Sequence, residues 1–202
     1  MNTALNTARG AGDRHDLIEP SSWVVRFAPL IASGGTVLDV ACGRGRHARW
    51  LEARGHRVTG IDRDQDALAV SGASERIVCD LEARADSREA RRPEWPMRWA
   101  VEERRFAAVI VTNYLHRPLF PLLIEALDQG GILIYETFAT GNARFGKPGN
   151  SAFLLERGEL LERCRALNIV AYEDGLVTSP RPASIQRICA IREPGEEERH
   201  AL

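Results

Sequence analysis

The residues best suited to chemistry lie in one segment, VLDVACGRGRHA, residues 37–48. It combines an apolar run, an acidic residue within that run, Asp39, and two glycines, Gly43 and Gly45. Glycines at a strand-to-helix turn let the backbone come close to a ligand, and the following helix presents its positive N-terminal end at the same place. Doubly wound sheets hold nucleotide-like cofactors in this way, so the segment predicts a cofactor site.

Two classes of cofactor fit the glycines alone, because G-x-G-x-x-A also matches the dinucleotide fingerprint. The acidic residues favour S-adenosylmethionine (SAM). Asp39 lies inside the strand, where a carboxylate suits a cofactor that carries a sulfonium and an ammonium group. Two more acidic residues end apolar runs: Asp62 is spaced to bind both ribose hydroxyls, and Asp80 with the Leu81 backbone is placed to meet the adenine edge.

The only lysine also argues against a nicotinamide enzyme of the Tyr-x-x-x-Lys type. Lys147 has Ala143, and not a tyrosine, four residues before it.

The elements that must position these residues alternate between strands and helices. We expect strands over 36–41, 56–62, 76–81, 106–113 and 132–138, and helices over 23–32, 47–55, 64–73, 119–131 and 153–167. This alternation predicts an α/β domain with a mostly parallel sheet.

The last two apolar runs, 168–177 and 185–192, are joined by too short a connection for a crossover helix, so they should be antiparallel neighbours. The expected fold is a doubly wound, seven-stranded, mostly parallel sheet with an antiparallel C-terminal hairpin and helices on both faces. An antiparallel end to the sheet is expected for methyltransferases and not for nicotinamide domains.

Over about residues 36–192 the chain resembles class I SAM-dependent methyltransferases, which are Rossmann-like transferases. The matching pieces are LDVACGRG, GID, CDLE, VTNYLH and QGGILIYE; Ala41 stands where the family commonly has glycine. Within the class the chain is most similar to the small single-domain enzymes of the tellurite-resistance type. The resemblance implies an enzyme that uses SAM. The expected cofactor-binding residues are Asp39, Ala41, Gly43, Gly45, Asp62, Arg63, Asp80, Leu81 and Asn113.

Each of these residues also has a purely structural interpretation. Asp39 could cap the following helix, Asp62 and Asp80 could be solvated turn residues, and the glycines could serve only the turn. The sequence leaves both interpretations open.

The methyl acceptor should lie beyond the carboxyl ends of the fourth and fifth strands. There we expect His116 as a general base, Arg117 as a holder of an anionic group, and Glu136 as a catalytic carboxylate. The alternative for His116 and Arg117 is a capped helix start with surface side chains. Because the sulfonium is already activated, methyl transfer mainly needs alignment and exclusion of water.

Composition excludes several classes of partner. The chain has 202 residues, with 27 Lys+Arg against 28 Asp+Glu and a net charge of −1. It lacks the basic excess of proteins that wrap nucleic acid, and no apolar run reaches the roughly 18 residues of a membrane helix. The N-terminus lacks the apolar core of a signal peptide. The four cysteines form no C-x-x-C pair, which argues against a metal site and favours a reducing cytoplasm.

The length predicts one domain. We expect residues 1–35 to be an N-terminal tail and helix that could cover the cofactor or substrate, 36–192 the methyltransferase domain, and 193–202 a polar tail. The flanks are too short for a separate recognition domain, which favours a small acceptor. The long link over 82–105 is either a solvated helix with a Trp-Pro anchor or a lid or substrate wall. Both a monomer and a homodimer stay open.

The leading hypothesis is therefore a cytoplasmic SAM-dependent methyltransferase acting on a small-molecule or small anionic acceptor by in-line displacement. A second hypothesis is a methyltransferase that modifies RNA or protein with a partner. The turn at Asn113 lacks the Asn-Pro-Pro-aromatic pattern for exocyclic base amines, and no cysteine ends the fourth or fifth strand, so base methylation is disfavoured. Two hypotheses from different classes also stay open: an NAD(P)-dependent oxidoreductase and a non-catalytic SAM-binding module.

Overall fold

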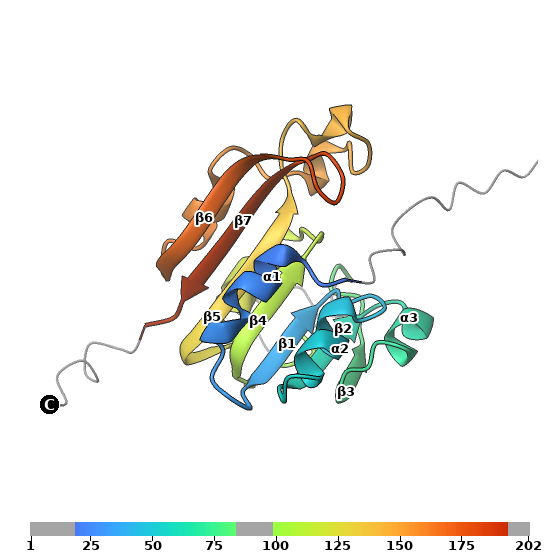
Figure 1. Ribbon diagram of the computed structural model, residues 1–202, viewed down its shortest axis with the longest axis vertical. Coiled ribbons are helices and arrows are strands. Elements are labelled where there is room, and N and C mark those ends of the chain that lie inside the picture. Colours follow the sequence, from blue (N-terminus) through green and yellow to red (C-terminus); the bar gives the residue numbers. More distant parts are fainter. Residues whose placement is uncertain (1–18, 84–98, 194–202) are drawn as a thin grey trace, which may run out of the picture.

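A seven-stranded sheet forms the centre of the computed structural model, which describes residues 19–83 and 99–193 (Figure 1). The strand order is β3-β2-β1-β4-β5-β7-β6. The first five strands are parallel, β7 is antiparallel to β5, and β6 is antiparallel to β7. The strands are β1 Thr36–Val40, β2 Arg57–Asp62, β3 Glu75–Val78, β4 Phe106–Thr112, β5 Leu127–Phe138, β6 Asn168–Val177 and β7 Ala183–Ile191. The fold class predicted from the sequence, including the terminal hairpin, is confirmed.

Short helices cover both faces of the sheet. Figure 1 shows α1 and α2 in front of it, and α4 and α5 pack on the other face, in the core cluster that contains Phe120 and Leu160. The α-helices are α1 Ser22–Phe27, α2 Arg46–Glu52, α3 Gln65–Ala69, α4 Phe120–Glu125 and α5 Glu159–Arg163. The 3-10 helices are η1 Ala28–Leu30, η2 Arg117–Leu119, η3 Asn142–Arg144 and η4 Ser151–Phe153.

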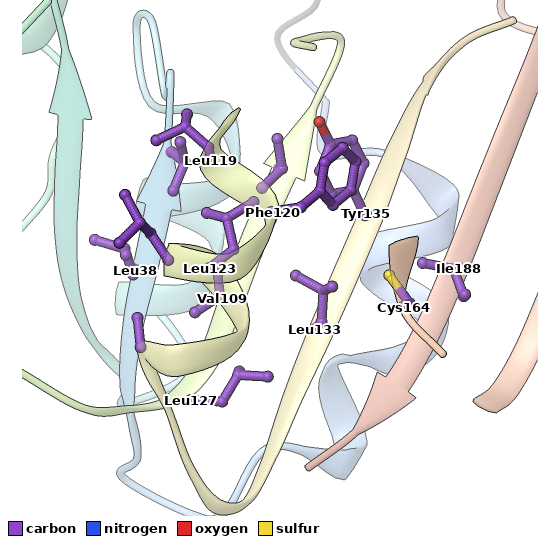
Figure 2. Packing of buried hydrophobic residues seen from close by; sticks show 14 of the residues in the cluster. Leu38, Val109, Leu119, Phe120, Leu123, Leu127, Leu133, Tyr135, Cys164 and Ile188 are labelled. Atoms are coloured by element: carbon purple, nitrogen blue, oxygen red, sulfur yellow. The ribbon is translucent and has the colours of Figure 1, made fainter. Parts of the chain in front are cut away.

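The two faces of the sheet carry separate hydrophobic clusters. On the α4 side, the rings of Phe120 and Tyr135 stack with centroids 5.2 Å apart, among leucines of β1, α4 and β5 (Figure 2). On the α1 side, Trp23 is only 1% exposed and its indole N–H donates to the Ile188 carbonyl at 3.1 Å. A helix as short as α1 is marginal by itself, so the burial of Trp23 is what holds it on the sheet.

Two predicted helices are partly wrong. The helix over 119–131 ends at Glu125, and β5 begins at Leu127. Gly131 lies within β5, where only glycine fits, because a Cβ there would lie 2.9 Å from the Phe106 carbonyl oxygen. The helix over 153–167 is confined to α5, because Leu155 forms a bridge with Ala139 and Gly158 adopts a φ of +71°.

The N-terminal helix expected over 23–32 is split into α1 and η1. Most of the link over 82–105 lies outside the described residues, so its two interpretations stay untested. In the part of the chain that the structure describes, no helix has both the length and the apolar character needed to cross a membrane.

Candidate functional site

The strand order reverses between β1 and β4. After β1 the chain builds β2 and β3 on one side, and it then crosses to build β4 and β5 on the other. At such a switch point the connections leave in opposite directions and open a crevice beyond the carboxyl ends of the strands. The loop after β1 and the end of β4 border this crevice.

The loop between β1 and α2 has an unusual backbone, with left-handed φ angles at Ala41 (53°), Gly43 (52°) and Gly45 (72°). Gly45 cannot carry a side chain, because a Cβ would lie 2.1 Å from the Ser71 carbonyl oxygen. At Gly43 a Cβ would meet no atom within 4 Å, so this part of the loop faces open space. The loop thus packs tightly on one side and leaves room for a ligand on the other.

Asp39 caps α2 from the neighbouring strand. Gly45 is the N-cap residue and has no side chain, so an Asp39 oxygen accepts the hydrogen bond of the Ala48 backbone N–H. The structural interpretation of Asp39 as a cap is therefore correct for one oxygen. The other, Oδ2, is buried without a hydrogen-bond partner among the described residues.

Burial raises the pKa of Asp39 to about 7, and the nearby Arg46 guanidinium opposes this shift. A buried carboxyl with an unpartnered oxygen is unfavourable in the fold itself. The same carboxyl is suited to a ligand that brings positive charge.

Asp62 braces the glycine loop from the end of β2. Its Oδ2 accepts from the Gly43 N–H at 2.7 Å and its Oδ1 from the Asp64 N–H at 2.9 Å. Each oxygen keeps further acceptor capacity, because a carboxylate has about four lone-pair sites. Asp62 is therefore a turn residue whose carboxylate can still accept hydrogen bonds from two hydroxyl groups.

Asp80 and Leu81 follow β3 in a tight turn. The Asp80 side chain is exposed, and its Oδ1 accepts from the Glu82 N–H at 3.0 Å, whereas Leu81 is buried. The turn interpretation of Asp80 thus holds for one of its two oxygens. Tyr114 lies near this turn, at the end of β4, and its hydroxyl donates to Glu82. Burial raises the pKa of Tyr114, and the carboxylates of Glu82 and Asp80 raise it further.

Asn113 ends β4 with a φ of 56° and an exposed side chain. Its backbone N–H donates to the Glu136 carbonyl at 2.9 Å. Asparagine tolerates this left-handed conformation better than most residues. This left-handed turn at Asn113 ends β4 and leaves the Asn113 side chain at the crevice. Arg63, which follows β2, is exposed at the same edge of the sheet.

Arg46 is a residue that sequence reasoning missed. It is half-buried, and its Nη2 lies 3.4 Å from Thr112 Oγ1 at the end of β4. Its Nη1 lies 3.4 Å from the Glu19 carbonyl oxygen. Arg46 therefore spans the switch point. The sequence could not distinguish it from Arg44, which is exposed, because that distinction depends on where α2 begins.

Glu136 takes part in a row of side chains across four strands. Thr112, Glu136, Arg187 and Glu173 are register partners on β4, β5, β7 and β6. Glu136 Oε2 lies 3.2 Å from Arg187 Nη1, and its Oε1 accepts from Ser21 Oγ at 2.8 Å. Both oxygens are thus engaged within the fold, which argues against Glu136 as a free catalytic base.

Arg117 lies apart from the rest of the predicted residues. It donates to both oxygens of Glu159 at 2.8 Å and to the carbonyls of Ala152 and Leu154 at 2.9 Å. With Glu159 it lines a groove of about 970 Å³ between α4 and α5, on the opposite face from α1. Its donors are used inside the fold, so the prediction that Arg117 holds an acceptor's anionic group is not supported.

His116 is half-buried just before η2, and its side chain does not cap that helix. Cys42, Cys79, Cys164 and Cys189 are buried and form no disulfide. Among residues 19–83 and 99–193, no group of three His, Cys, Asp or Glu side chains could hold a metal ion.

The structure thus places Asp39, Gly43, Asp62, Asp80 and Asn113 at one edge of the sheet. The unpartnered oxygen of Asp39, the open space beside Gly43 and the remaining acceptor capacity of Asp62 fit a cationic nucleoside cofactor.

Comparison with known proteins agrees with this arrangement. A family model described as "Methyltransferase domain" matches residues 13–189. TehB from Haemophilus influenzae superposes with a TM-score of 0.65 at 18% identity, covering 85% of this chain and 61% of TehB. A TehB-like SAM-dependent methyltransferase from Corynebacterium glutamicum gives 0.57 at 18% identity, covering 85% and 88%. The N-methyltransferase NodS from Bradyrhizobium japonicum gives 0.58 at 15% identity, covering 84% and 94%.

The chain therefore spans less than two thirds of the length of TehB. At these identities the likeness to each solved structure is a likeness of fold. No curated protein sequence matches the chain.

Proposed function

The chain belongs to the methyltransferase-domain family, and from that premise we propose that it transfers the methyl group of SAM to a small-molecule or small anionic acceptor by in-line displacement. It is a class I SAM-dependent methyltransferase of the TehB-like kind, an enzyme whose cofactor is SAM. The observation that carries the proposal is the carboxyl of Asp39, buried with one free oxygen beneath the glycine loop at the switch point.

When bound, SAM supplies a methyl group that is already activated on a sulfonium. Asp62 would accept the ribose hydroxyls while it braces Gly43, and Asp80 with the Leu81 N–H would meet the adenine edge. Asn113 would accept from the ammonium group. We assign Ala41, Gly43 and Gly45 to backbone contacts, because their left-handed turn gives a ligand access to the main chain, and Arg63 to the rim beside Asp62.

A small acceptor is favoured by the way residues 19–21 cross the strand ends. The Ser21 hydroxyl donates to Glu136, and the Ser21 backbone N–H donates to His47 Nε2 at 3.1 Å. His47 is buried, and burial lowers its pKa to about 3, so its ring stays a neutral acceptor. This fixed segment narrows access to the crevice and helps to exclude water, which methyl transfer requires.

His116 remains the candidate base at the acceptor side, and Glu136 acts as a positioning residue for Ser21. A base is needed only for an acceptor that must lose a proton before or during attack. A soft anionic nucleophile would need none, so His116→Ala distinguishes the two classes of acceptor: activity falls with the first class and is unchanged with the second.

The binding site is tested by calorimetric titration with SAM, S-adenosylhomocysteine and NAD. The proposal predicts binding of the first two and none of NAD; binding of NAD alone would overturn it. Asp62→Ala should weaken SAM binding by roughly 1–3 kcal/mol through lost charged hydrogen bonds. Asp66→Ala, an exposed carboxylate four residues away, is the matched control and should leave the affinity unchanged.

A further inference from the structure

A pair of apolar side chains, Phe138 and Ile185, lies on the acceptor side of the crevice and outside the cores of the fold. The two residues are register partners on β5 and β7. Phe138 is half-buried and Ile185 is 8% exposed, but neither belongs to the two hydrophobic clusters that the described residues form. Core packing therefore does not account for this pair.

The pair continues the face of the sheet on which α1 packs. Side chains alternate along a strand, so Phe138 lies on the same face as Glu136, which accepts from Ser21 just before α1. Ile185 lies on the same face as Arg187, the ion-pair partner of Glu136. Phe138 and Ile185 therefore belong to the next row of side chains toward the carboxyl end of β5, one step beyond the charged row.

This row has room beside it. β4 ends with Thr112, which pairs with Glu136, so no residue of β4 pairs with Phe138. On the other side, Gly175 of β6 pairs with Ile185, and a Cβ at Gly175 would meet no atom within 4 Å. The apolar row of Phe138, Ile185 and Gly175 carries no charged side chain. It therefore presents an apolar surface with open space at its β6 end.

We propose that Phe138 and Ile185 bind a hydrocarbon or aromatic group of the methyl acceptor, so that the acceptor is an organic molecule with an apolar part. This inference rests on the proposed function and chooses among the acceptors that it allows. Removing apolar surface from water favours binding in proportion to the area buried. A bare inorganic anion has no group that would cover this surface, whereas an organic acceptor does.

The apolar row also orients the acceptor. The cofactor site lies at the switch point between β1 and β4, so the nucleophilic atom of the acceptor faces β4 while its apolar group extends over β5 and β7. A group held against Phe138 has little freedom to rotate, and it displaces water from the strand ends. Methyl transfer depends on both alignment and exclusion of water. Phe138 and Ile185 thus determine specificity through binding and take no part in the chemistry.

The test measures how affinity depends on the length of a hydrocarbon chain. The probes are the primary alkanols from ethanol to hexanol, which differ only in their number of CH₂ groups, and the protein is first loaded with S-adenosylhomocysteine. A titration followed by ligand-observed NMR should show a Kd that falls by about two- to fourfold for each added CH₂, as partial to full burial of that group predicts. An affinity that does not change with chain length, or no binding of any alkanol, would overturn the inference.

Phe138→Ala should reduce this dependence on chain length to less than about twofold for each CH₂. Phe153→Ala, an exposed phenylalanine on η4 outside the apolar row, is the matched control and should leave the dependence unchanged. If Phe138→Ala does not fold, Gly175→Asp places a charge in the open space beside Ile185 and should weaken hexanol more than ethanol. An unchanged dependence in the folded variant would show that the alkanols bind elsewhere and overturn the inference. If the unaltered protein does not bind S-adenosylhomocysteine, the proposed function itself is overturned.

Discussion

Replacing Asp39 by Asn tests the link between the buried carboxyl and the cofactor. Asn has nearly the same shape, and its amide oxygen can still accept from the Ala48 N–H, so the cap of α2 is kept. The change removes the ability to ionise. Asp39 is 1% exposed, and burial raises its pKa from the usual 3.8 to about 7.

Because the pKa of Asp39 is higher in the folded than in the unfolded chain, ionisation of this carboxyl destabilises the fold. Between about pH 4 and pH 7 the folded chain keeps the Asp39 proton that the unfolded chain has lost, so stability falls as the pH rises. At 1.36 kcal/mol per pKa unit the full cost above pH 7 is about 4 kcal/mol, of which about 2–3 kcal/mol develops between pH 5 and pH 8. Asp39→Asn has no carboxyl to ionise at this position, so its stability does not fall with pH for this reason.

The assay is urea denaturation of both proteins at pH 5, 6, 7 and 8. The free energy of unfolding of Asp39→Asn should rise relative to that of the unaltered protein by about 2–3 kcal/mol over this range. The same substitution should reduce the preference for SAM, which is a sulfonium cation, over S-adenosylhomocysteine, which has a neutral sulfur. A stability difference that does not change with pH would refute the reasoning about the buried carboxyl.

Three further substitutions test the loop and the ion pair. Ala41→Gly relieves a left-handed φ that costs about 1–2 kcal/mol, against an entropic cost of about 0.5–1 kcal/mol, so thermal denaturation should show a Tm that is unchanged or a few degrees higher. Gly45→Ala should destabilise by more than about 3 kcal/mol and abolish SAM binding, because its Cβ would meet the Ser71 backbone; a normal Tm would contradict the loop geometry. Arg117→Ala should cost about 1–3 kcal/mol in a urea titration while SAM affinity stays unchanged, since Arg117 contacts Glu159 and not the crevice.

The fold is predictable from the sequence because its signals are local. The apolar run of β4 and the run around Asp39 in β1 lie buried on both faces, as continuous apolar strands should. The short connection before β7 requires antiparallel pairing, and the structure has it. The helix expected over 119–131 is wrong beyond Glu125, because its leucines suit a strand as well as a helix, and the pairing of Leu127 with Phe106 decides between them.

The site is predictable only in part, because side-chain partners distant in the sequence decide each role. The position of Asp39 can be read from the motif, but its two roles depend on Ala48 and on burial. The sequence predicts a catalytic Glu136, yet the hydroxyl of Ser21, 115 residues earlier, donates to one of its oxygens. Arg117 pairs with Glu159, 42 residues later. No local sequence pattern predicts contacts between residues so far apart in the chain.

The most direct test of the central claim is transfer of a labelled methyl group. The purified protein is incubated with methyl-labelled SAM and, separately, with the small-molecule and the macromolecular fractions of a cell extract. The account predicts label in products of the small-molecule fraction, with release of S-adenosylhomocysteine, and a loss of this transfer in Asp62→Ala but not in Asp66→Ala. Label confined to RNA or protein, or no consumption of SAM with either fraction, would contradict it.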